Sequence, residues 1–187
     1  MASTSFTNHL QVLLQDPEEM NQAHRRLRTG LRGRQYGLGS LNRAIVVLCV
    51  SSWEAFIEQL LIESLDLMRP SNPVGSPWPT VKAFAGSQIA RFNTPNSENT
   101  KRLFAECLGL PDITAHWSWR GSSVQNTRIS LNDILMLRHH VAHGVNPRPK
   151  IHNGYASWMP NFFRRLGSCS EKGVQQHLVD LGVVVPW

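Results

Sequence analysis

The sequence is poor in the features that build disulfide scaffolds, zinc knuckles and membrane spans. Its 187 residues include three scattered cysteines, Cys49, Cys107 and Cys169, without CxxC spacing. An odd number of distant cysteines indicates reduced, mostly buried thiols, as in a cytoplasmic protein. The longest apolar run, Ala44 to Val50, is too short to cross a bilayer. Residues 1–15 lack the basic start and apolar stretch of a signal peptide. We therefore expect a soluble, cytoplasmic protein without a membrane partner.

The sequence also lacks internal repeats, a glycine-rich phosphate loop and strand patterns of useful length, apart from the short stretch Val183–Val185. Apolar residues instead recur at helical spacing over most of the chain. This pattern predicts an all-α fold, and the length suits one domain over residues 1–187.

Lysine is scarce, with four Lys against fifteen Arg, and the formal net charge is +6. Between Met20 and Trp53 there are six arginines and no acid, while the other thirteen basic residues balance the thirteen acidic ones. The excess positive charge therefore lies in one stretch, which favours an anionic partner such as nucleic acid. A solvated helix face in an arginine-rich protein is the alternative.

Helix signals divide the chain into segments. Asp16 and Pro17 have the pattern of an N-cap followed by proline, which predicts a basic helix over 17–34 with Arg25, Arg28 and Arg32 on one face. Further helices are expected at 38–68, 80–91, about 94–108, 124–143, 157–166 and 171–181, with a loop at 69–79. Trp158, Phe162 and Phe163 are expected in the core of the C-terminal region.

Arg138 has an unusual position on the helix predicted over 124–143. Leu131, Ile134, Leu135 and Ala142 form its apolar stripe, and Arg138 falls in the middle of that stripe. A guanidinium is not buried unpaired, because its desolvation costs several kcal/mol. Either an acid pairs with Arg138, or the stripe opens onto a cleft or subunit interface.

Two histidines accompany this arginine. His139 and His143 lie one turn apart on one flank of the stripe, whereas His140 points the opposite way. Arginine can hold a phosphate and histidine can move a proton near neutral pH, so the group can support RNA cleavage by the ribose 2′-hydroxyl.

The stretch R-H-H-V-A-H-G, Arg138 to Gly144, resembles the R-x4-6-H signature of the HEPN superfamily. Four flanking motifs occur in order: Val50-Ser-Ser-Trp-Glu-Ala-Phe, Phe92-Asn-Thr-Pro, Leu108-Gly-Leu and Trp117-Ser-Trp-Arg-Gly. With them the chain is most similar to the RiboL-PSP-HEPN family. The similarity covers about residues 38–144, and more loosely the C-terminal helices expected in 145–187.

The resemblance implies a HEPN-like helical bundle that forms a homodimer, in which two signatures make one composite site. It implies metal-independent RNA cleavage without a cofactor, leaving a cyclic phosphate, in a toxin–antitoxin or antiphage setting with an antitoxin or defence-complex partner. Arg138 and His143 are then the catalytic pair and His139 the polar neighbour. Glu54 corresponds to an acid that often pairs with the signature arginine, and Ser52 is a weaker candidate.

Other interpretations stay open at this stage. Many HEPN domains bind without cutting, so a non-catalytic module that binds RNA or a partner protein is the alternative function. His139 and His143 are also spaced like two zinc ligands, with His116 and His152 as distant further candidates, although no third ligand is obvious. Trp117, Trp119 and Arg120 can stack on RNA bases, although paired tryptophans more often brace a loop against a core. Arg25, Arg28, Arg32 and Arg120 are the candidate RNA-binding residues.

Overall fold

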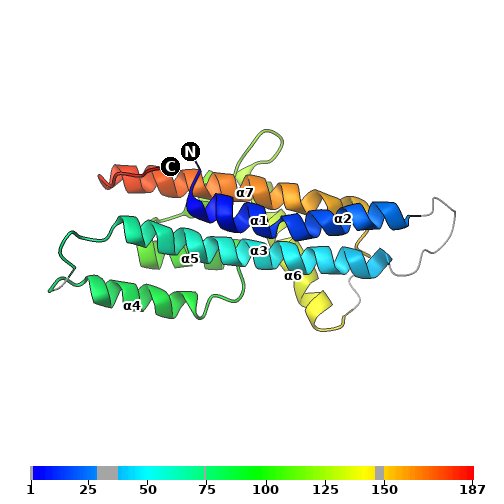
Figure 1. Ribbon diagram of the computed structural model, residues 1–187, viewed down its shortest axis with the longest axis horizontal. Helices are drawn as coiled ribbons and strands as arrows, with labels where there is room; N and C mark the ends of the chain where they lie inside the picture. Colours follow the sequence, from blue (N-terminus) through cyan, green and yellow to red (C-terminus); the bar gives the residue numbers. More distant parts are fainter. Residues whose placement is uncertain (1, 29–37, 74, 146–149) are drawn as a thin grey trace.

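The computed structural model describes residues 2–28, 38–73, 75–145 and 150–187 (Figure 1). Over these residues the chain is helical, and its one strand-like contact is an isolated bridge between Trp119 and Ser122. The all-α prediction is confirmed. Val183–Val185 is not a strand: these residues follow the last helix as coil, and the Val183 N–H donates to the Leu178 carbonyl, 2.9 Å away.

Nine helical elements are described along the chain. In order they are η1 (Ser5–Leu10, a π-helical stretch), α1 (Gln11–Leu13), α2 (Gln15–Leu27), α3 (Leu38–Leu67), α4 (Trp78–Ile89), α5 (Ser97–Leu108), η2 (Ile113–His116, a 3-10 turn), α6 (Val124–Ala142) and α7 (Asn153–Asp180).

The long helices α3 and α7 form the centre of a bundle, and the N-terminal helices lie along both (Figure 1). The α3 helix supplies most of the core. It is long and apolar enough to cross a membrane, with a mean hydropathy of 1.8 over its most apolar stretch, but 56% of that stretch is buried inside the protein. A core helix of a soluble protein has this pattern, because its apolar residues face other helices.

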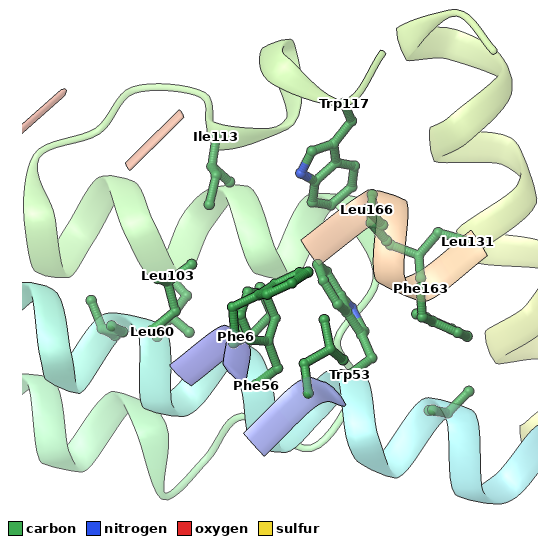
Figure 2. Close-up of a cluster of buried hydrophobic side chains, with 14 of the residues drawn as sticks. Phe6, Trp53, Phe56, Leu60, Leu103, Ile113, Trp117, Leu131, Phe163 and Leu166 are labelled. Atoms are coloured by element: carbon green, nitrogen blue, oxygen red, sulfur yellow. The ribbon is translucent and has the colours of Figure 1, made fainter. Parts of the chain in front are cut away.

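Aromatic side chains fill the core between α3, α7 and the η2 region (Figure 2). The Trp53 ring lies 5.9 Å from that of Trp117 and 6.0 Å from that of Phe163. The Trp117 Nε1 atom donates to the Ser170 Oγ atom at 2.8 Å, so this fully buried indole keeps a hydrogen-bond partner. Trp117 is therefore structural, as its pairing with a second tryptophan suggested.

The N-terminal segment differs from the prediction. The chain is already helical from Ser5, so Asp16 does not cap a helix, and α2 begins at Gln15 after a turn at Leu14. Pro17 lies in the first turn of α2, where its missing N–H costs no helical hydrogen bond. Phe6, Leu10 and Leu14 recur every fourth residue and are buried, which is the pattern of a helix inner face.

The basic helix is also shorter than predicted. It ends at Leu27, and Arg28 has an extended backbone, so Arg25 and Arg28 do not share a helix face. The sequence beyond is rich in glycine, a poor helix former. Arg32 and Arg34 lie outside the described residues.

The C-terminal region forms one helix, α7, where two were predicted. Gly167 looks like a break, but it lies where α7 approaches the N-terminal helices. A Cβ atom there would overlap the Leu10 side chain and lie 3.4 Å from the Phe56 ring. This glycine allows close helix packing and does not end the helix.

Hydrogen bonds connect the N-terminal segment to both central helices. The Glu63 carboxylate, on α3, accepts from the Thr4 N–H at 3.0 Å and from the Ser5 N–H at 2.8 Å. The buried Glu171 carboxylate, on α7, accepts from the Ser3 N–H. Two acids thus satisfy the free N–H groups of the first helical turn.

Candidate functional site

The α6 helix carries the candidate residues on its last turns. Ser123 caps its start, accepting from the Asn126 N–H at 3.2 Å. Leu131, Ile134 and Leu135 are buried against the bundle, whereas Met136 is 57% exposed and Ala142 is exposed. The C-terminal end of α6 extends past α3 in Figure 1. Toward this end the apolar stripe becomes exposed, since Arg138 is half-buried and Ala142 is exposed.

The helix end is held in a Schellman motif. The Gly144 N–H donates to the Val141 carbonyl at 3.3 Å, and the Val145 N–H donates to the His140 carbonyl at 2.9 Å. Gly144 has a φ of 69°, the left-handed conformation that this motif needs and that glycine adopts without strain. His143 is the C-cap, and its N–H donates to the His139 carbonyl at 3.0 Å. The backbone that carries His143 is therefore ordered by its own hydrogen bonds.

The two signature-side histidines lie against each other. The ring centroids of His139 and His143 are 4.3 Å apart at an interplanar angle of 50°, and both residues are exposed. The ring of His140 is farther from His139, at 6.2 Å. Two adjacent exposed imidazoles near an arginine can exchange protons with a bound substrate.

The charge of Arg138 affects Glu54, although the two side chains form no ion pair. Both are half-buried, and the described residues contain no ion pair between them within 4.0 Å. Burial raises the pKa of Glu54, and the positive charge of Arg138 partly offsets that rise. Of the two outcomes expected for Arg138, the structure shows the open stripe together with an acid at longer range.

A second acid, missed in the sequence, lies one turn after Glu54. Burial raises the pKa of Glu58, and the negative charge of Glu54 raises it further. The i, i+4 spacing of the two acids on α3 was the available signal. Ser52, the weaker candidate, is buried, and its hydroxyl donates to the Leu48 carbonyl of its own helix at 2.8 Å.

The candidate RNA-binding arginines are spread over the molecule. Arg25 and Arg28 are exposed at the end of α2, and Arg120 is exposed in the turn closed by Trp119 and Ser122. The described residues contain no cluster of three or more His, Cys, Asp or Glu that could hold a metal ion, and His116 and His152 do not join His139 and His143 in one.

The chain belongs to the RiboL-PSP-HEPN family: the model of that family matches residues 11–169. The match extends beyond the 38–144 region that carries the recognisable motifs, and includes α1, α2 and the first half of α7. Neither the curated proteins nor the solved structures searched gave a match. The helical elements establish the fold class, and the family match establishes the family. Membership of this family is consistent with a nuclease-type function.

Proposed function

We propose that this protein is a cytoplasmic, metal-independent endoribonuclease that cleaves RNA through the Arg138–His143 pair. The observation that carries the proposal is the projecting end of α6, where exposed His139 and His143 rings lie 4.3 Å apart beside half-buried Arg138. Membership of the RiboL-PSP-HEPN family supports it. The spacing of Arg138 and His143 in the sequence also resembles the superfamily signature.

The reaction needs one base and one acid. One imidazole removes the proton of a ribose 2′-hydroxyl, and the resulting oxygen attacks the adjacent phosphorus. The bond from phosphorus to the 5′-oxygen breaks, and a second imidazole donates a proton to that oxygen. The products are a 2′,3′-cyclic phosphate and a 5′-hydroxyl end. The Arg138 guanidinium stabilises the charge that develops on the phosphate oxygens.

The second imidazole comes from a second copy in this proposal. Two copies would bring two α6 ends together and form one site from two arginines and two histidines. The exposed apolar side chain of Val145 (52%), just past the end of α6, suits a protein contact. Sedimentation should show a dimer, and a monomer with full cleavage activity would overturn the composite site.

The deciding experiment is cleavage of a mixed single-stranded RNA by purified protein in EDTA, beside His143→Ala. We expect cyclic phosphate ends and a loss of about 10²–10⁴-fold in the variant. Because His143 is exposed, the variant should keep its melting temperature. Equal cleavage by both proteins would refute the site, and loss of cleavage on chelation would favour a metal site at His139 and His143.

A non-catalytic binding module is the second candidate, favoured by the charge coupling of Arg138 and Glu54. In that case Arg138 has a structural role, and well-folded protein binds RNA or a partner protein without cutting. A toxin or antiphage role, with an antitoxin or defence complex as partner, belongs to the first candidate and is tested by expression of the parent and of His143→Ala in cells.

A further inference from the structure

A second candidate site lies at the other end of α6. It is a pocket of about 400 Å³ whose lining includes Trp119 and Ser122 of the turn before α6, Asn126, Ile129 and Ser130 of α6, and Trp158 of α7. Its volume is within the range of small-molecule sites, about 300–1,000 Å³. Sequence patterns placed Trp158 in the core, but this indole is 38% exposed.

Contacts with neighbouring aromatic rings hold the two indoles of the pocket in position. The Trp158 ring lies 4.7 Å from the Phe162 ring and 5.7 Å from the Tyr155 ring, the latter stacked at 30°. The Trp119 ring lies 5.8 Å from the same Phe162 ring. Two indoles braced on one buried phenylalanine give flat surfaces that need little reordering when a ligand stacks on them.

The polar groups of the pocket are available for a ligand. Within the described residues, the Asn126 amide and the Ser130 hydroxyl take part in no hydrogen bond. An amide presents both donors and an acceptor, and a hydroxyl can act as either. These groups can read the edge of a planar heterocycle that stacks on the indoles.

The distribution of charge indicates which planar ligand fits. None of the lining residues is charged, so the part of the ligand inside the pocket is neutral. Arg120, which is exposed, lies in the chain between Trp119 and Gly121, two residues that line the pocket. A neutral ring inside and an anion outside correspond to a nucleobase with its phosphate.

The pocket is connected to the candidate catalytic residues by one face of α6. Ile129, Met136 and His143 are seven residues apart, or about two turns each, and so follow one face. All three are exposed. The distance from Ile129 to His143 along the helix is about 21 Å, at 1.5 Å per residue. A single strand lying along this face would reach both sites.

We propose that the Trp119–Trp158 pocket binds one unpaired nucleobase of a single-stranded RNA whose scissile phosphate lies at the end of α6. The inference rests on the RNA substrate proposed above. It gives the enzyme a preference for single-stranded substrates with a suitable base at a set distance from the cut, because duplex bases are not free to stack on side chains.

The test is binding of a labelled 2′-O-methyl RNA hexanucleotide, which lacks the attacking hydroxyl and so is not cut, followed by fluorescence anisotropy. Trp158→Ala should weaken binding roughly 5- to 150-fold, the effect of losing one base–aromatic stack. Trp158→Phe should retain most of the affinity. Phe84→Ala, at an aromatic residue of α4 that is 45% exposed, is the matched control and should bind as the parent does.

Asn126→Ala is a second test of the pocket, needed in case Trp158→Ala does not fold correctly. Asn126 is exposed and its side chain has no hydrogen bond in the described structure, so the variant should melt like the parent yet bind more weakly and with an altered base preference. Affinities of Trp158→Ala and Asn126→Ala within twofold of the parent would overturn the pocket. Binding of a short peptide at this site in place of RNA would also overturn it.

The two proposals fail in different ways. If the parent binds the hexanucleotide through Trp158 but cuts no RNA, the catalytic proposal fails and the pocket stands. If the parent cuts RNA and Trp158→Ala cuts it at the same rate and positions, the pocket fails and the catalytic proposal stands.

Discussion

At the scale of single residues, the environment of Arg138 and Glu54 indicates how much Arg138 contributes to folding stability, as distinct from catalysis. A fully buried pair would make loss of the arginine cost about 3–5 kcal/mol of folding free energy. Here both side chains are half-buried and form no ion pair within 4.0 Å, so each keeps much of its hydration. Arg138 therefore matters for folding far less than its place in the apolar stripe suggests.

Arg138→Ala should lower the free energy of unfolding by about 1 kcal/mol or less, as for partly exposed charge pairs. It should also raise the pKa of Glu54, because the charge that offsets the effect of burial is removed. RNA cleavage should fall by orders of magnitude. Urea titration, NMR titration of the Glu54 carboxyl and the EDTA assay measure the three effects. A loss of several kcal/mol with unchanged cleavage would favour the structural role.

Asp112 is the acid whose ionised form most clearly stabilises the fold. Although burial opposes it, a hydrogen bond from the Thr114 hydroxyl and the charges of Arg128 and Lys101 lower the pKa of Asp112. The Arg128 Nη2 atom lies 3.0 Å from the Asp112 Oδ2 atom. Because the folded-state pKa is below the unfolded one, the stabilisation is present above the unfolded pKa, about 3.9, and is lost as pH falls through the folded pKa.

Asp112→Asn should lower the free energy of unfolding at pH 7 by about 1 kcal/mol, with a smaller difference at pH 3. Asparagine keeps the N-cap at the start of η2, so the change isolates the charge. Asp66→Asn, which removes an exposed ion pair with Lys82, is the control and should have little effect. A difference that grows at low pH would contradict the assignment.

At the scale of elements, Gly167 shows why α7 packs closely on the N-terminal helices. Gly167→Val should destabilise the protein by about 1–3 kcal/mol, because the new side chain overlaps Leu10 in a filled core. Gly86→Ala, on exposed α4 with open space around it, should instead stabilise by roughly 0.5–1 kcal/mol. Melting curves of the two variants test both predictions: we expect a lower melting temperature for Gly167→Val and a higher one for Gly86→Ala.

The elements also show how far the sequence could predict the fold. The predicted bounds of α3 and α6 agree with the structure to within one residue, because their apolar periodicity and terminal proline or glycine are local signals. The continuity of α7 could not be predicted, since Gly167 is explained only by its contact with Leu10, far away in the sequence.

The candidate site shows the same division. The proximity of His139 and His143 follows from helical spacing. The family motif predicted that Glu54 pairs with Arg138; the structure shows an effect of the Arg138 charge on Glu54 but no ion pair within 4.0 Å. The sequence did not predict the pocket, because Trp119, Ile129 and Trp158 come from three segments that meet only in the fold. The role of Arg32 and the single-domain assignment stay predictions.

At the scale of the whole molecule, the three free cysteines act as reporters of folding. Burial raises the pKa of Cys107 to about 11. Burial also raises the pKa of Cys49 and of Cys169, at the latter against the charge of Lys172. Since the thiolate is the reactive form, the native protein holds few reactive sulfurs at neutral pH.

We expect slow reaction of the native protein with a disulfide reagent at pH 7 and rapid reaction of three thiols in denaturant. Cys169, the least buried of the three, should react first, and Cys49 should react only when the bundle opens. Mass spectrometry of the partly reacted protein gives the order. Early modification of Cys49 would mean that α3 is less protected than its burial indicates.

The contact between Ser3 and Glu171 also constrains when the protein can fold during its synthesis. The two residues are 168 positions apart, so the ribosome adds the second roughly ten to thirty seconds after the first. Over that interval Phe6 and Leu10 lack the α7 surface beside Gly167 on which they pack. A nascent chain therefore exposes an apolar helix that a chaperone can bind, and the bundle closes only after the codons for α7 have been read.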